Sequence, residues 1–173
     1  MAGPLDGIRV VEFSEIIAGP VSGVLLSDLG ANVIKVEPPW GDPWRGSPTR
    51  VGPPEAKETR GFIAVNRGKR SIRLDLTKPE GVKVVHRLVR QSDVVITNHR
   101  PDVPAKLGID YETLSAIKPD LIYCEITAFG RSGPENAKPG YDIIMQARTG
   151  LMATNGSIEH GVPRVIRGTP PID

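Results

Sequence analysis

The chain has 173 residues, of which 39% are hydrophobic and 24% are charged. This composition is typical of an ordinary globular domain and excludes a fibrous or disordered chain. Because 22 basic residues are interspersed with 20 acidic ones, the net charge of +2 is too small to indicate a nucleic acid or an anionic membrane as partner. The N-terminus lacks a signal-peptide pattern, and no apolar run approaches the roughly 20 residues that span a bilayer. We therefore expect a cytoplasmic protein.

Five short runs are rich in apolar and β-branched residues and are predicted to be strands. They are almost continuously apolar, which is typical of a sheet that is covered on both faces. The runs are residues 8–13, 32–37, 71–76, 93–97 and 121–127. The last run contains Cys124, the only cysteine, which excludes a disulfide within one chain and is expected to be a buried small hydrophobe.

Helical patterns follow most of these runs, at residues 20–30, 77–91, 110–117 and 140–152. The sequence Thr-Lys-Pro-Glu that begins the second pattern has the spacing of a capping box, and Asp110 can cap the third. Alternating strands and helices predict an α/β fold with a doubly wound, mainly parallel sheet. Two Pro- and Gly-rich stretches, 38–60 and 128–140, are expected to be long loops.

The motifs of several enzyme classes are missing. The first strand–helix turn lacks the second glycine of G-x-G-x-x-G, which disfavours a plain NAD-binding domain. There is no Walker A sequence, no H-E-x-x-H and no G-x-S-x-G, so nothing supports a P-loop enzyme, a metal site or a serine hydrolase. Among the three histidines, His99 is the one that is well placed for a ligand, because it follows a predicted strand.

Six blocks of the sequence occur in a characteristic order. They are PLDGIRVVEFSEIIAGP, LLSDLGANVIKVEPP, NRGKRSIRLDLTKPEG, DVVITNHRP, LGIDYETL and GYDIIMQARTGLMATNG. Together they resemble the family III CoA-transferases, the group of formyl-CoA and carnitine-CoA transferases, whose fold is shared by the α-methylacyl-CoA racemases.

The resemblance implies a Rossmann-like large domain, a small domain and an interlocked homodimer. Because members of the family are more than twice as long, residues 1–173 are expected to be the N-terminal portion of the large, CoA-binding domain. The resemblance also implies that CoA or acyl-CoA and a carboxylic acid are the substrates, without a permanently bound cofactor. The acyl donor and acceptor are not indicated by these residues.

The resemblance places the nucleophile at Asp173, after the helix that begins with Gly-Tyr-Asp. Asp142 is the rival carboxylate and is interpreted as a ligand-contact or structural residue. A carboxylate is ionised at neutral pH and can attack a thioester carbonyl without an activating base. A glycine-rich loop that helps to stabilise the oxyanions lies beyond Asp173 in the family, so this chain alone is expected to turn over poorly.

The resemblance further implies a set of CoA contacts, although Leu74 can equally be a core residue and Lys106 a solvated one. The expected contacts are the backbone of Ile17 and Ala18 along the cofactor, Leu74 at the adenine, Asn98, His99 and Arg100 beside the nucleotide, Lys106 and Leu107 at the phosphates, and Tyr141 and Asp142 toward the pantetheine.

Other readings stay open. Racemases of this fold carry histidine before the shared aspartate, and Tyr141 at that position favours a transferase. Pro38, Thr77 and Pro139 replace cations of the oxalate-handling members, which weakens a formyl-CoA:oxalate assignment but not the family. A non-catalytic CoA-binding module of this length is the third reading. The loop residues Trp40 and Trp44 could shape a pocket or anchor the loop.

Overall fold

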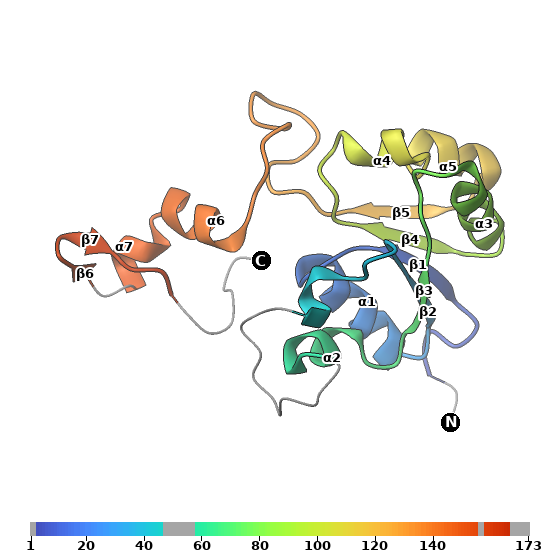
Figure 1. Cartoon of the computed structure of the whole chain (residues 1–173), viewed down its shortest axis with the longest axis horizontal. Coiled ribbons are helices and arrows are strands. Elements are labelled where there is room, and N and C mark those ends of the chain that lie inside the picture. The colour runs from blue at the N-terminus through green and yellow to red at the C-terminus, as the bar shows by residue number, and fades with distance from the viewer. Residues whose placement is uncertain (1–2, 47–57, 156–157, 167–173) are drawn as a thin grey trace. The chain divides into compact units, whose positions relative to one another are not determined.

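The computed structural model describes residues 3–46, 58–155 and 158–166 (Figure 1). The chain divides into two compact units between Ile126 and Thr127. Within these ranges, no helix combines the length and apolar character needed to cross a membrane.

The first unit is built on a sheet of five parallel strands in the order β3-β2-β1-β4-β5. The strands are β1 (Arg9–Phe13), β2 (Asn32–Glu37), β3 (Arg70–Arg73), β4 (Val94–Thr97) and β5 (Ile122–Glu125). Four of the five predicted runs contain one of these strands, and the run 71–76 overlaps β3, which begins one residue earlier and ends at Arg73. The order reverses between β1 and β4, so the doubly wound fold that the sequence predicts is confirmed.

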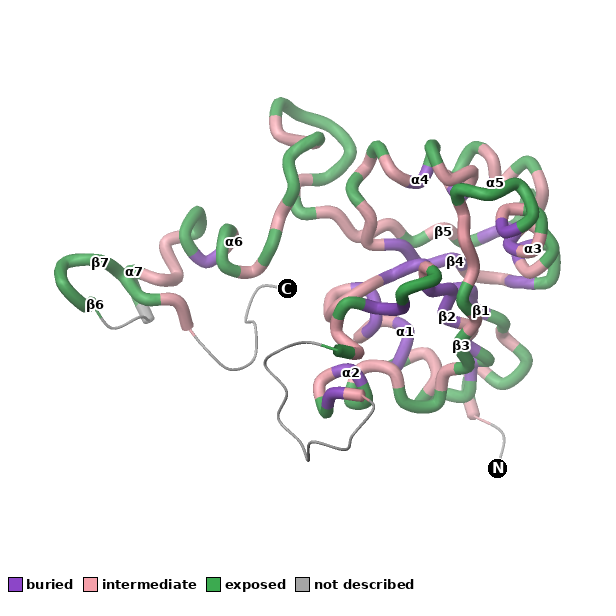
Figure 2. The backbone as a smooth tube through the Cα atoms, viewed as in Figure 1, coloured by how far each residue is buried: buried purple, intermediate pink, exposed green. Residues whose placement is uncertain are grey.

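Helices cover both faces of this sheet (Figure 1). On one side lie α1 (Ala18–Asp28) and α2 (Arg60–Asn66), and on the other lie α3 (Pro79–Val89), α4 (Val103–Leu107) and α5 (Tyr111–Ile117). Neighbouring strand residues point to opposite faces, so Val10 joins one apolar cluster and Val11 the other. Figure 2 shows the buried residues concentrated along the central strands.

Of the two predicted helix caps, one is confirmed and the other is wrong. Asp110 caps α5 as expected, because its carboxylate accepts a hydrogen bond from the Thr113 amide at 2.9 Å. The prediction of a capping box at the start of α3 is wrong. The Thr77 hydroxyl donates to Asp75 at 2.6 Å instead, and Lys78 takes the cap position without a side-chain bond. The hydroxyl is occupied in a local turn before the helix begins.

Three short elements of the first unit were not predicted, α4 among them, and the cysteine is not buried as expected. Helix α2 begins after Thr59, whose hydroxyl accepts from the Phe62 amide at 3.1 Å, and η1 (Pro43–Gly46) lies in the first long loop. Cys124 is exposed, not buried. It lies on β5 at the edge of the sheet, where an apolar run has fewer neighbours to pack against than it has in a central strand.

The second unit contains α6 (Asp142–Arg148), α7 (Leu151–Asn155) and a hairpin of β6 (Ile158–Glu159) and β7 (Val162–Pro163). The helical pattern over 140–152 is divided at Gly150, whose φ of 78° interrupts the helix. Gln146 is fully buried and exchanges two hydrogen bonds with the backbone of Ile166, at 2.9 and 3.3 Å.

Candidate functional site

A cavity of about 250 Å³ opens in the first unit at the carboxyl ends of four parallel strands. Phe13 and Glu37 end β1 and β2, Leu74 follows β3, and His99 follows β4. Open α/β sheets bind ligands at this edge, next to the point where the strand order reverses. The lining residues are Phe13, Glu15, Val36, Glu37, Pro38, Pro39, Trp40, Leu74, Asp75, Leu76, Thr77, His99, Val103 and Leu107.

Three of the residues expected to contact CoA line this cavity: Leu74, His99 and Leu107. Nδ1 of His99 lies 2.8 Å from the Thr97 hydroxyl, which fixes the orientation of the imidazole. Burial lowers the pKa of His99 below its usual value of 6.5, and the nearby Lys35 lowers the pKa further. The ring is therefore neutral at pH 7 and can take part in hydrogen bonds as a neutral group.

Asn98 lies beside the cavity and joins two loops. Its side chain accepts from the Glu15 amide at 2.9 Å and donates to the Glu15 carbonyl at 2.8 Å. This pair fastens the end of β4 to the turn that leads into α1, where Ile17 and Ala18 lie. The turn is held in an unusual conformation, because Ile16 has a φ of 67°, which is costly for a β-branched residue.

The two cations that were expected near the nucleotide share one carboxylate. Nζ of Lys106 lies 2.7 Å from Asp102, and Nε of Arg100 lies 3.3 Å from the same carboxyl group. Both side chains are more than half exposed, at 69% for Lys106 and 55% for Arg100. These ion pairs are therefore weak and can exchange for contacts with an anionic ligand.

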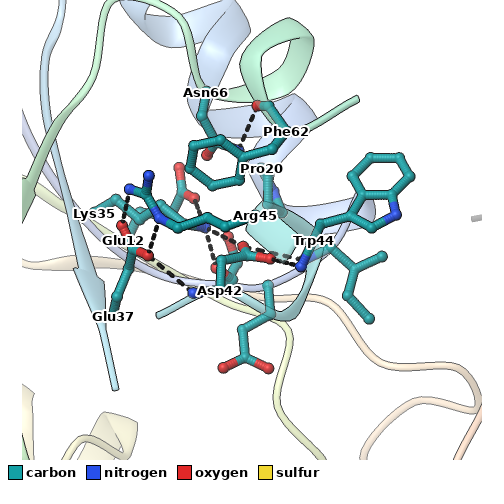
Figure 3. Close-up of polar contacts among 12 residues, drawn as sticks. Glu12, Pro20, Lys35, Glu37, Asp42, Trp44, Arg45, Phe62 and Asn66 are labelled. Carbon is teal, nitrogen blue, oxygen red and sulfur yellow. Dashed lines mark hydrogen bonds and ion pairs between the residues drawn. The ribbon is translucent and has the colours of Figure 1, made fainter. Parts of the chain in front are cut away.

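Beneath the turn before α1 lies a cluster of buried charges that sequence reasoning missed (Figure 3). Nζ of Lys35, on β2, lies 3.2 Å from Glu12 and 3.0 Å from Asp42, and it donates to the Ser14 carbonyl at 2.5 Å. All three charged side chains are at most 2% exposed. Asp42 also accepts from the Ile16 amide at 3.3 Å, so the cluster contacts the strained turn directly.

Lys69 completes the pairing of Glu12 from the other side. Its ammonium lies 2.7 Å from Oε2 of Glu12 and donates to the Pro20 carbonyl and to Asn66. Burial lowers the pKa of Lys69, and the interaction with Glu12 opposes that shift. Helix α1 can cross this carboxylate only at a glycine, because a Cβ on Gly23 would lie 1.8 Å from Oε2 of Glu12.

The loop after β2 is fixed by the third cation of the cluster. Nε and Nη2 of Arg45 donate to the two oxygens of Glu37 at 2.7 and 2.6 Å, and the Arg45 guanidinium lies 4.0 Å from the centre of the Phe62 ring. Burial would raise the pKa of Glu37, but hydrogen bonds from Arg45, Ser71 and the Asp42 amide outweigh it and lower the pKa to about 2. Glu37 is therefore ionised throughout the physiological range.

The buried charge cluster stabilises two loops at the edge of the cavity. Lys35, Lys69 and Arg45 neutralise the buried carboxylates of Glu12, Asp42 and Glu37. These ion pairs hold two loops in place, one after β1 and one after β2, and both loops border the cavity. Charged residues within the apolar runs IRVVEF and NVIKVE were the sequence signal for this cluster.

The remaining expected site residues belong to the second unit. Tyr141 takes the N-cap position of α6 without a side-chain capping bond and is 60% exposed. Asp142 is the first residue of α6 and accepts from the Gln146 amide group at 2.5 Å. Asp173 lies outside the described residues. In the parts of the chain that the structure describes, no group of His, Cys, Asp and Glu side chains could hold a metal ion.

Comparison with known proteins settles the family. The model of CoA-transferase family III matches residues 5–173. The chain belongs to this family. A succinate–glutarate CoA-transferase of Agrobacterium fabrum is 49% identical over 88% of the chain and 39% of its own length. An acetyl-CoA:oxalate CoA-transferase of Acetobacter aceti is 41% identical over 96% of the chain and 42% of its own length.

Two solved structures of similar sequence have the same fold. A CAIB/BAIF family protein from Brucella suis is 45% identical and superposes with a TM-score of 0.84, over 96% of this chain and 44% of that protein. A hypothetical protein from Mycobacterium tuberculosis is 39% identical with a TM-score of 0.85, over 95% and 45% of the two chains. This family III chain thus spans less than half the length of these relatives.

Proposed function

We propose that this family III chain binds CoA at the carboxyl ends of its strands and that the protein transfers CoA between an acyl-CoA and a carboxylic acid. The observation that carries the proposal is the cavity itself. It brings together Leu74 from the β3–α3 connection, His99 from the β4–α4 connection and Leu107 from the end of α4. Membership of the family supplies the chemical class of the ligand.

The phosphates of CoA would lie at the exposed cations beside the cavity. Arg100 and Lys106 can leave Asp102 for the ligand, because exposed ion pairs are worth about 0–1 kcal/mol and charge-assisted hydrogen bonds to phosphate are stronger. The braced turn at Ile17 and Ala18 would present backbone groups along the cofactor without needing to be ordered on binding.

We propose that Asp173 is the nucleophile of the transfer. Its carboxylate attacks the thioester carbonyl, the carbon–sulfur bond breaks, and CoA leaves as a thiolate from a mixed anhydride. The thiolate then attacks the aspartyl carbonyl of that anhydride, releases the donor acid and leaves an aspartyl–CoA thioester. The incoming carboxylate repeats the two steps in reverse order, which regenerates Asp173 and forms the new acyl-CoA.

The names of the relatives suggest which acids to try first. Succinate, glutarate and oxalate, each with its CoA thioester, form the starting panel. The interlocked homodimer, the cytoplasmic location and the assignment of residues 1–173 to the large CoA-binding domain are further parts of the proposal.

Trapping of the acyl-enzyme tests the nucleophile. During turnover, hydroxylamine should convert the activated side chain to a hydroxamate, and peptide mass spectrometry should locate it at Asp173. Asp173→Asn should abolish both the label and the transfer, while Asp142→Asn should keep the label. Full activity of Asp173→Ala would refute the assignment. Exchange of the α-proton of a 2-methylacyl-CoA in D₂O, without CoA transfer, would instead favour the racemase reading.

A further inference from the structure

The most exposed large apolar side chain in the described ranges lies at the cavity. Trp40 is 77% exposed and is one of the cavity's lining residues. A protein surface tolerates single apolar residues, but an indole at the mouth of an apolar pocket is typical of a binding surface. The other tryptophan has a different role. Trp44 donates its amide to Asp42 at 2.8 Å, accepts from the Thr59 hydroxyl at 2.7 Å, and anchors the loop against α2.

The backbone that carries Trp40 is a fixed turn. The Gly41 amide donates to the Pro38 carbonyl at 2.8 Å, and the proline rings of Pro38 and Pro39 restrict φ at both positions. Gly41 itself has a φ of 85°, which glycine adopts without strain. The Asp42 amide then donates to Glu37 at 2.9 Å, so the turn is tied to the buried charge cluster. The backbone that carries the indole is therefore already ordered, and binding does not have to order this turn.

The size and lining of the cavity select one part of CoA. Pockets for whole drug-sized ligands measure roughly 300–1,000 Å³, so about 250 Å³ fits one ring system and not the entire coenzyme. The walls are mainly apolar, but His99, Thr77 and Asp75 supply polar groups for the edge of a heteroaromatic ring. An aliphatic acyl chain would have no use for these groups.

We infer that Trp40 is a further binding residue that stacks on the adenine ring of CoA and so selects a purine at the nucleotide end of the ligand. The inference rests on the proposed function, because it assumes that CoA is the ligand of the cavity. The inference adds an aromatic contact to that function. The flat indole covers one face of the base, and Leu74 and Leu107 contribute apolar contacts within the cavity.

Fluorescence distinguishes the two tryptophans. In the single-tryptophan variant Trp44→Phe, CoA and adenosine 3′,5′-bisphosphate should each quench the emission in a saturable way. In Trp40→Phe, the emission of Trp44 should stay nearly constant while CoA still binds. Equal quenching of Trp44 in the Trp40→Phe variant would contradict the stacking.

Affinity provides the second measurement. By calorimetry, Trp40→Leu should bind CoA roughly 5- to 100-fold more weakly than the unmodified chain, the range expected when base stacking is lost. Trp40→Phe should keep most of the affinity, and both variants should keep the thermal midpoint of the unmodified chain. If Trp40→Leu binds CoA as tightly as the unmodified chain does, the stacking is refuted and the proposed function stands. If the unmodified chain binds neither CoA nor the bisphosphate, the proposed function and the stacking fail together.

Discussion

Replacing Lys35 with methionine removes the cation that lies between Glu12 and Asp42. Nζ of Lys35 is 3.2 Å from one carboxylate and 3.0 Å from the other, and both carboxylate side chains are 0% exposed. Methionine has a similar length and no charge, so the change tests the electrostatics more than the packing. Removing one partner of a buried ion pair costs about 3–5 kcal/mol, because it leaves a charge without compensation.

The variant should therefore lose a large share of its stability. For a chain of this size, about 3–5 kcal/mol corresponds to a fall of roughly 6–20 °C in the thermal midpoint. Urea unfolding followed by far-UV circular dichroism measures the free energy of unfolding directly.

A matched surface variant shows whether burial is the cause. Arg67 pairs with Asp28, and these side chains are 55% and 42% exposed, so Arg67→Met should cost at most about 1 kcal/mol. Partial recovery of stability in the double variant Lys35→Met, Glu12→Gln would support the mechanism, because one of the stranded charges is then removed. A loss below about 1 kcal/mol in Lys35→Met alone would refute the reasoning.

Three further predictions each concern one residue and its contacts. Gly23→Ala should destabilise the chain by more than about 2 kcal/mol in urea, because the new Cβ would lie 1.8 Å from Oε2 of Glu12, whereas Gly46→Ala meets no atom within 4 Å and should be near neutral. Glu37, whose pKa falls from 4.5 to about 2 on folding, contributes on the order of 3 kcal/mol that is present above pH 4.5 and is lost as the pH falls toward 2. Acid unfolding of Glu37→Gln should lack that part of the pH dependence, and an unchanged profile would contradict the assignment. Asp110→Ala should cost about 1 kcal/mol by loss of the α5 cap, and Asp110→Asn should retain most of that stability.

The sheet could be predicted because each strand is recognisable from its own short run of residues. Apolar runs such as IRVVEF need no partner to be recognised, and Asp110 has its cap interaction three residues away. Cys124 shows the limit of this reasoning, since an edge strand and a central strand have the same composition, and only the strand order shows which one is exposed. Helix α2 was missed although Thr59 is a good N-cap residue, because the helix has only seven residues and follows a Pro-rich loop.

The candidate site could be predicted only in part, for a different reason. Leu74 and His99 lie at the cavity because the residues after parallel strands gather at one edge of the sheet, and Leu107 lines it from the end of α4. The cluster around Lys35 depends on which strand neighbours which, and on Asp42 folding back from a loop. Such pairings between distant positions are fixed by tertiary packing and are difficult to infer from a single sequence.

The central claim is that CoA binds at the carboxyl ends of the parallel strands. An NMR titration of the ¹⁵N-labelled chain with CoA tests this claim most directly. We expect saturable shifts of the amides at Ala18, Leu74, His99 and Leu107, with little change at the opposite strand ends near Asn32. Shifts confined to other parts of the chain, or none at millimolar CoA, would contradict it.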